Sequence, residues 1–286
     1  MNLREPYYTL AFTAGGCPWD IRVNDGPVLS DGEGRGTVST EIPINRWLAD
    51  GPNEISMRLK PGAGLPRGEV RLELFVREHA LPKESKTSLF RLETKTPLPG
   101  VPQAEEPGSP DGGESGQEAA LPITLQPESG GILLGRHEFT ASMPAPPWSW
   151  MAQSPAPLSE ADRTALAAEV RKFWEVLKSE DPKALLEALS ARSSELQRAF
   201  YMSAEDFERE LLGHFTYLWE EDDWQLKKLD LSDLDFRSFG GGRLYQPYDR
   251  VTNESVVYYV DQSDGEADYL DIIFARDGKG GWLIVR

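Results

Sequence analysis

Residues 7–95 alternate apolar and polar positions with a period of two, and Gly, Pro, Asn and Asp separate the alternating runs. This period places every second side chain on the same face of a strand, so each run predicts a strand with one buried face. Strands at this spacing, with no amphipathic helix among them, favour an all-β sandwich or jelly roll. The runs cover residues 8–13, 19–23, 37–44, 54–59, 70–76 and 89–94.

Trp47 lies in a short turn between two of these runs. An exposed Trp would be a ligand platform of the kind found in carbohydrate-binding sandwiches. No other aromatic residues align with it on one face, so we expect Trp47 to fill the core.

The composition changes at residues 97–122, where Pro, Gly, Glu, Gln and Ser dominate and almost no side chain is suited to burial. Such a composition predicts a flexible segment. The strand pattern resumes beyond it, so we expect a mobile loop inside a first domain that spans residues 1–145. The resumed runs cover residues 123–125, 132–134 and 137–143.

A Pro-rich linker of semi-stiff character is expected at residues 146–158. Trp148 and Trp150 are expected to hold this linker against one of the domains. A second domain follows over residues 159–286, and it begins where the apolar period changes from two to that of a helix.

Three helices are predicted in the second domain from their N-terminal signals. Ser159 and Asp162 have capping-box spacing, Asp181 precedes Pro182, and Ser203 stands three residues before Asp206. The first helix presents an apolar face made of Leu166, Val170, Phe173 and Leu177. Strand-like runs then follow, and we expect one curved antiparallel sheet with the three helices on its concave side. These runs cover residues 224–231, 243–248, 255–260, 269–275 and 282–285.

The chain ends in a predicted hairpin whose turn reads Asp-Gly-Lys-Gly-Gly before Trp282. With this D-G-x-G-G-W hairpin and its order of helices and strands, the second domain resembles the nuclear transport factor 2-like superfamily. The resemblance implies a cone-shaped α+β fold and covers residues 159–286. That superfamily includes both enzymes and pure binding modules.

Enzymes of this superfamily carry an Asp, His or Tyr on the concave face, where burial can raise a carboxyl pKa toward neutrality and create a general base. Asp271 is in strand phase with Tyr269, and His214 lies on the third predicted helix. If the protein is an enzyme, these three residues are the candidates. Asp268 belongs to the opposite face, so one of the two carboxylates is expected to be solvated.

Signatures of metal and nucleophile chemistry are absent from the sequence. The three histidines are far apart, and there is no Cys pair, H-E-x-x-H, G-x-S-x-G or Walker-type glycine loop. Three consecutive glycines at residues 240–242 precede a predicted strand, so we expect a hairpin loop there. The sequence therefore predicts no cofactor, no metal site and no catalytic group of a familiar type.

The net charge is −17, and the excess lies in the second half, where residues 155–286 hold 27 acidic and 16 basic residues. A field of this sign repels phosphate backbones and anionic lipids, so nucleic acid and membrane are poor partners. It would attract a basic protein. Solubility is the alternative explanation of an acidic surface.

The densest charge is a run of four acids between Trp219 and Trp224. Like charges in sequence resist burial and predict an exposed loop. Flanking aromatic rings give the loop the composition of a partner-binding patch. The alternative is a helix end with solvated acids and core tryptophans. The candidate patch consists of Trp219, Glu220, Glu221, Asp222, Asp223 and Trp224.

The N-terminal residues do not have the basic and apolar regions of a signal peptide, and no run of eighteen apolar residues occurs. Cys17 is the single cysteine and has no disulfide partner within the chain. We therefore expect a cytoplasmic protein. The features together favour a non-catalytic binding protein, most specifically an immunity protein that neutralises a basic toxin such as a nuclease. Its general character is similar to that of the immunity proteins of type VI secretion effectors. The alternative is a small-molecule enzyme or sensor that uses the pocket of the cone-like domain.

Overall fold

The computed structural model describes residues 3–34, 36–60, 69–94, 121–144 and 147–286. It divides into two compact units, Met1–Pro144 and Ala145–Arg286, here called the N-terminal and C-terminal units. Most of the loop predicted at residues 97–122 lies outside the described residues. At its end, Leu121–Pro122 forms the short strand β8.

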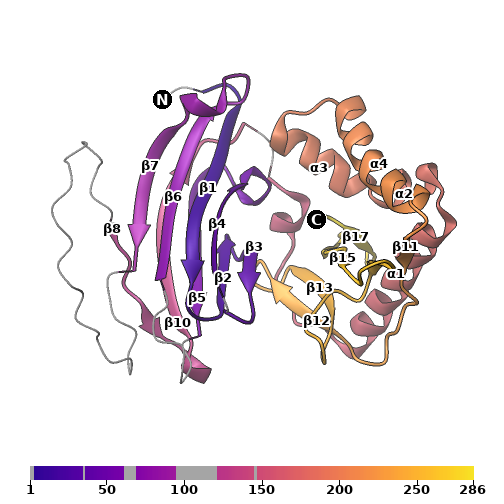
Figure 1. The fold of residues 1–286 in the computed structure, drawn as a ribbon. Coiled ribbons are helices and arrows are strands. Elements are labelled where there is room, and N and C mark those ends of the chain that lie inside the picture. Colours follow the sequence, from indigo (N-terminus) through magenta and orange to yellow (C-terminus); the bar gives the residue numbers. More distant parts are fainter. Residues whose placement is uncertain (1–2, 35, 61–68, 95–120, 145–146) are drawn as a thin grey trace. The chain divides into compact units, whose positions relative to one another are not determined.

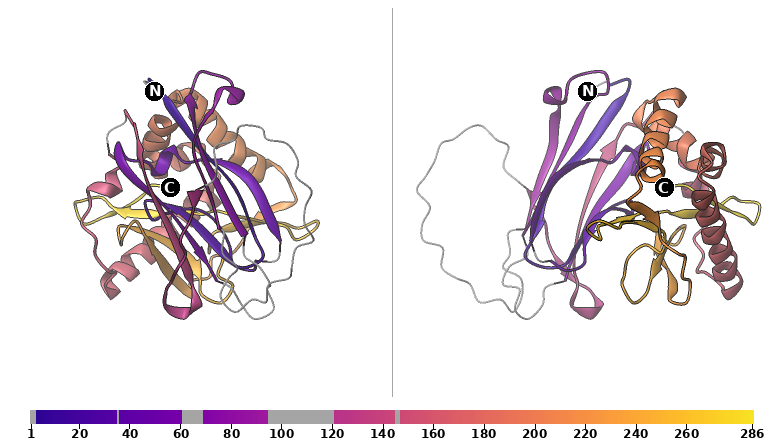
Figure 2. Two further views of the ribbon diagram at one scale, coloured as in Figure 1. Left: turned by 90° about the vertical axis from the view of Figure 1, so that its left-hand side faces the viewer. Right: turned by 45° about the vertical axis from the view of Figure 1, so that its right-hand side comes forward.

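The N-terminal unit is rich in β-structure, as the alternating pattern predicts, and its strands form two five-stranded sheets (Figures 1 and 2). One sheet has the order β4-β1-β6-β7-β8 and the other has the order β3-β2-β5-β10-β9. Neighbouring strands are antiparallel except β7 and β8, which are parallel. The bounds are β1 Pro6–Gly15, β2 Trp19–Val23, β3 Gly26–Asp31, β4 Thr37–Pro43, β5 Gly51–Leu59, β6 Glu69–Glu78, β7 Thr87–Glu93, β9 Gln126–Pro127 and β10 Leu133–Ala141.

The core of this unit lies between the two sheets. Along β1 the buried and half-buried side chains alternate, and Phe12 meets Trp19 of the other sheet with ring centroids 5.6 Å apart. Trp47, in the short 3-10 helix η1 (Asn45–Trp47), is 1 % exposed, so its predicted place in the core is confirmed. A Cβ atom on Gly26 would lie 2.3 Å from the Trp47 ring, so the indole requires glycine there.

One strand of this unit was not predicted, and one predicted strand does not form. The sequence Asn-Asp-Gly-Pro at residues 24–27 is typical of a turn, so no strand was predicted there. Only Asn24 and Asp25 make the turn, with positive φ, and strand β3 begins directly at Gly26. Residues 123–125 form no strand, since the ladder residues are those on either side of them in β8 and β9.

The C-terminal unit contains helices α1 Glu160–Ser179, α2 Pro182–Ala188, α3 Ser190–Phe200 and α4 Ala204–Glu220. Three of these begin where their cap residues predict, and Ser159 and Asp162 form the complete capping box. Helix α3 was not predicted. It follows α2 directly, has no side-chain cap, and buries the polar Ser193 and Glu195, so its apolar period is weak.

The strands of the C-terminal unit form two antiparallel sheets, and the prediction of one curved sheet was wrong. The orders are β11-β14-β15 and β12-β13-β16-β17. The predicted strand at residues 269–275 is interrupted because Ile272 and Ile273 are both buried, which breaks the period of two. The bounds are β11 Trp224–Leu226, β12 Leu234–Phe239, β13 Leu244–Asp249, β14 Tyr258–Asp261, β15 Ala267–Tyr269, β16 Phe274–Arg276 and β17 Trp282–Ile284.

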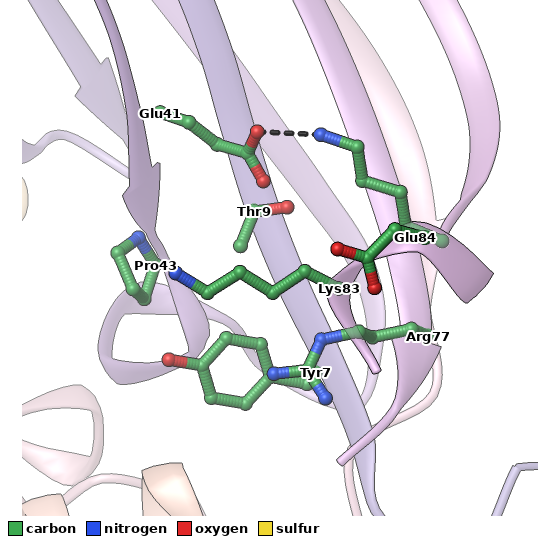
Figure 3. A pocket seen from close by; sticks show the side chains of 8 residues that line it. Tyr7, Thr9, Glu41, Pro43, Arg77, Lys83 and Glu84 are labelled. Carbon is green, nitrogen blue, oxygen red and sulfur yellow. Dashed lines mark hydrogen bonds and ion pairs between the residues drawn. The ribbon is translucent and has the colours of Figure 1, made fainter. Parts of the chain in front are cut away.

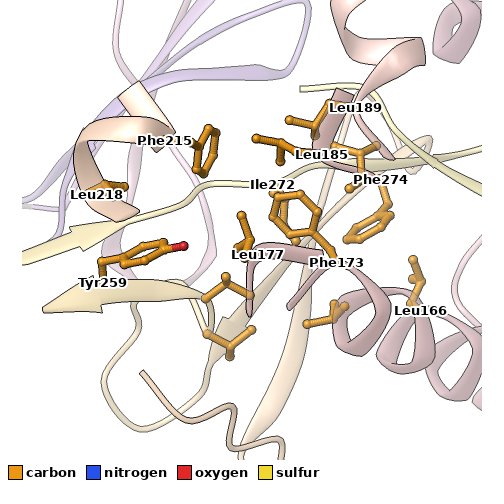
Figure 4. Packing of buried hydrophobic residues seen from close by; sticks show 14 of the residues in the cluster. Leu166, Phe173, Leu177, Leu185, Leu189, Phe215, Leu218, Tyr259, Ile272 and Phe274 are labelled. Atoms are coloured by element: carbon orange, nitrogen blue, oxygen red, sulfur yellow. The ribbon is translucent and has the colours of Figure 1, made fainter. Parts of the chain in front are cut away.

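Helices and strands of this unit share one hydrophobic core (Figure 4). The predicted face of α1 is fully buried there, and Phe215 and Leu218 of α4 face it from another side. The predicted terminal hairpin is confirmed by the pairing of β16 with β17. Trp148 and Trp150 are also buried, and the guanidinium of Arg286 lies 5.4 Å from the centroid of the Trp148 ring.

Candidate functional site

The acidic run lies at the C-terminal end of α4. Glu220 is the last helical residue, Glu221 is its C-cap, and all four acidic side chains of residues 220–223 are exposed. Negative side chains at a helix C-terminus oppose the helix dipole, so this placement costs a small amount of stability. Because all four side chains are exposed, the carboxylates remain solvated and accessible.

The two flanking tryptophans are partly buried against the core of the C-terminal unit. The Trp219 Nε1 donates a hydrogen bond of 3.0 Å to the hydroxyl of Tyr259, and its ring lies 5.9 Å from that of Phe215. Burial raises the pKa of Tyr259 to about 12, against the opposing effect of this hydrogen bond. Trp224 begins β11 and pairs with Asp261. The exposed aromatic side chain near the run is instead Tyr217.

A second acidic loop lies beside the first. The Asp223 carbonyl accepts a hydrogen bond of 2.8 Å from the backbone N–H of Gln262, which places residues 220–223 against the β14–β15 turn at residues 261–266. That turn contributes Asp261, Asp264 and Glu266. The two segments, here called the acidic double loop, contain seven acidic residues and no basic one. Within the described chain, none of the seven forms an ion pair.

The Asp271, His214 and Tyr269 candidates have separate partners. The Asp271 Oδ1 accepts a hydrogen bond of 2.8 Å from Gln246, and Asp271 is exposed. His214 is 48 % exposed, and its Nε2 lies 3.3 Å from Asp268 Oδ2, so its acidic neighbour is the carboxylate that strand phase had assigned to the other face. Tyr269 packs on Tyr258 with ring centroids 5.0 Å apart.

A pocket of about 380 Å³ lies in the N-terminal unit, on the face of the β4-β1-β6 sheet that points away from the core (Figure 3). Tyr8 and Leu10 of β1 are buried, so the alternate residues Tyr7 and Thr9 point to the opposite face and line this pocket. Strand register adds Pro43 opposite Thr9 and Arg77 opposite Tyr7. The 3-10 helix η2 (Lys83–Ser85), between β6 and β7, forms a wall. The full lining is Tyr7, Thr9, Glu41, Pro43, Arg77, Lys83, Glu84 and Lys86.

Arg77 fixes the segment that leads from β6 to this wall. Its Nη1 donates hydrogen bonds to the backbone carbonyls of Glu78, His79 and Leu81, with lengths of 3.1, 2.5 and 2.8 Å. The guanidinium carbon also lies 4.4 Å from the centroid of the Tyr7 ring. The first part of the connection from β6 to β7, which leads into η2, is therefore tied to the sheet beneath it.

The sequence patterns did not reveal this pocket. Its residues come from three strands and a connecting segment that are distant in the chain, so no local motif marks them. The available signal is weak: Lys83, Glu84 and Lys86 form a charged connection between two strands, and Arg77 occupies an outward position shortly before it.

Among the described residues, no group of three or more His, Cys, Asp or Glu side chains is arranged to hold a metal ion. No helix in the described part of the chain is long and apolar enough to cross a membrane. No protein-family model matches the chain, and neither the curated proteins nor the solved structures that were searched contain a match.

Proposed function

We propose that this chain is a cytoplasmic, non-catalytic binding protein that recognises a basic protein through the acidic double loop. In its most specific form the proposal is an immunity protein that occupies and neutralises a basic toxin, such as a nuclease effector of a type VI secretion system. The C-terminal unit would be a divergent member of the nuclear transport factor 2-like superfamily, and the two sheets of the N-terminal unit would form a sandwich domain.

The observation that carries the proposal is the joining of two acidic segments that are separate in sequence. The backbone hydrogen bond between Asp223 and Gln262 unites four acids from one loop with three from another. Seven like charges in two adjacent loops, six of them on exposed side chains, attract a basic protein over distances of about a Debye length and orient it during encounter. Such charges act more on the association rate than on the lifetime of a complex.

The partner also needs an anchor that excludes water, because rim charges alone contribute little to a complex's lifetime. Trp219 is committed to the hydrogen bond with Tyr259 and to the core. Tyr217, one helical turn before Glu221, is 52 % exposed and is the better anchor. The proposal therefore assigns steering to the acids and contact area to Tyr217, while Trp219 and Trp224 hold the loop in position.

The alternative of a small-molecule enzyme in the C-terminal unit receives less support. A catalytic pair of Asp271 and His214 would need the two side chains close enough to act on one bound molecule, since a general base must lie within hydrogen-bond reach of the proton that it abstracts. Asp271 and His214 are each engaged with a different residue, Gln246 and Asp268.

The experiment is coexpression with the products of the genes beside its own, because an immunity protein is encoded next to its toxin. We expect one neighbouring product to arrest growth when expressed alone and to become harmless, and to copurify, when this chain is present. A variant with residues 220–223 changed to Ser should protect less well. A control with Glu175, Glu187, Glu208 and Glu210 changed to Gln loses the same charge from exposed positions and should protect normally. Absence of any neighbouring product that binds would contradict the proposal.

A further inference from the structure

The pocket of the N-terminal unit contains charges of both signs, and most of them already have partners. The Glu41 carboxylate accepts a hydrogen bond from the Lys86 ammonium and lies near the Thr9 hydroxyl. Lys86 also lies 4.1 Å from the centroid of the Phe75 ring. These contacts balance Glu41 against Lys86, and Arg77 is committed to the carbonyl groups that it holds.

Lys83 and Glu84 have no such close partner among the described residues, although the Lys83 charge also acts on Glu41 at longer range. Within the part of the chain that the structure describes, neither side chain forms a hydrogen bond or an ion pair. Figure 3 shows the Lys83 side chain extending across the pocket toward Pro43, and the Glu84 carboxylate near the base of the Lys83 side chain. Two adjacent residues of η2 therefore present one positive and one negative charge to the same cavity, and neither is held in a close pair with a described residue.

We propose that this pocket binds a small zwitterion such as a free α-amino acid, with the anionic group on Lys83 and the cationic group on Glu84. The assignment follows from charge. A purely anionic ligand could pair with Lys83 but would leave Glu84 without a partner, and a purely cationic ligand could pair with Glu84 but would leave Lys83 without one. A ligand with both charges satisfies both side chains.

The size and rigidity of the pocket agree with this ligand. A volume of about 380 Å³ is at the lower end of the range for small-molecule sites. Because Arg77 ties the segment that leads into η2 to the sheet, binding would have less of the connection to order, which lowers its entropic cost. The Tyr7 hydroxyl adds a polar group to the lining on the side of Pro43.

The test is a solution NMR titration of the full chain with a mixture of the twenty common α-amino acids. Parallel titrations use their N-acetyl derivatives, which lack the cationic group, and their amides, which lack the anionic group. We expect saturable shifts of the backbone amides of Arg77, Lys83 and Glu84 with one or more free amino acids. Blocking either charge should weaken binding by about tenfold or more, the usual effect of losing a charge-assisted hydrogen bond.

Variants identify the responsible side chains. Lys83→Gln and Glu84→Gln should each weaken binding by about tenfold or more, whereas Lys83→Arg should retain most of it. Lys60→Gln and Glu138→Gln change exposed charges elsewhere in the N-terminal unit and should have no effect. The absence of shifts with every free amino acid, or equal responses to free and N-acetylated forms, would overturn the proposal. The pocket and the acidic double loop share no residue, so this result is independent of the proposed protein partner.

Discussion

Two regions of the C-terminal unit carry charge in opposite ways: a buried ion pair between Arg286 and Glu195, and the acidic double loop at the surface. The Arg286 Nη1 and the Glu195 Oε2 are 2.6 Å apart, and their side chains are 2 % and 5 % exposed. Glu195 also accepts a hydrogen bond of 2.7 Å from the backbone N–H of Ser149. In the acidic double loop six of the seven carboxylates are exposed, Asp261 is half-buried, and all seven share one sign.

The difference separates charges that maintain the fold from charges that are available to a partner. A buried ion loses hydration, so it persists only with a close counter-charge and additional hydrogen bonds. An exposed carboxylate keeps its water, and its removal costs little stability. Replacing Glu195 should therefore affect folding, whereas replacing Glu220 should affect association.

The largest predicted effect is the loss of stability caused by Glu195→Ala. Removing one partner of a buried ion pair leaves the other charge buried, so we expect the free energy of unfolding to fall by about 3–5 kcal/mol. Urea denaturation followed by tryptophan fluorescence measures this change. Glu175→Ala, at an exposed position of α1, is the control and should change stability by less than about 0.5 kcal/mol. Equal effects of the two substitutions would show that the buried pair is not structural.

A smaller effect is predicted for Trp219→Ala. Its ring is partly buried and hydrogen-bonded to Tyr259, so we expect a loss of about 2–3 kcal/mol, below the range for a fully buried Trp. Tyr217→Ala, on the same helix but exposed, should leave the melting temperature almost unchanged and accelerate dissociation of the partner. The reverse pattern would assign the anchor to Trp219.

Asp162→Asn should cost about 1 kcal/mol at neutral pH, because Asp162 completes the capping box of α1. The Ser159 hydroxyl and backbone N–H, together with the Arg276 guanidinium, lower the pKa of Asp162, against a smaller opposing effect of burial. A lowered pKa stabilises the fold above the unfolded-state value of about 3.9, and this contribution is lost as the pH falls through the folded-state value. Denaturation curves of both proteins should converge as the pH falls below the lowered folded-state pKa of Asp162. A constant difference down to that pH would exclude the ionised carboxylate as the cause.

The sequence predicted elements whose signals are local. Ser159, Asp181 and Ser203 mark three helix starts correctly because a cap satisfies backbone groups within its own turn. Helix α3 has no such signal and buries Glu195, whose partner Arg286 lies 91 residues away. No local pattern could have paired these two residues.

The candidate sites also depend on contacts between segments that are distant in the chain, which local patterns do not predict. Strand phase linked Asp271 to Tyr269, but phase holds only along a continuous strand, and the chain leaves β15 after Tyr269. In the ion pair of His214, the carboxylate is that of Asp268 and not that of Asp271. The acidic run was visible in the sequence, whereas its extension by residues 261–266 depends on the pairing of β11 with β14.

The smallest predicted change in stability is that of the variant with residues 220–223 changed to Ser. These side chains are exposed and form no ion pair with any described residue, so the free energy of unfolding should change by less than about 0.5 kcal/mol. Removing four acids from a helix C-terminus also relieves an unfavourable interaction with the dipole. A loss of more than about 2 kcal/mol would show that the loop is structural.

The central claim, that the acidic double loop steers a basic protein, is tested most directly by the association rate constant of this four-Ser variant. Stopped-flow fluorescence with the partner obtained by coexpression should show association slowed by about tenfold at low salt, with little change in the dissociation rate. The difference from the unaltered protein should shrink as salt approaches physiological strength, where the Debye length is about 8 Å. An unchanged association rate constant at low salt would contradict the account.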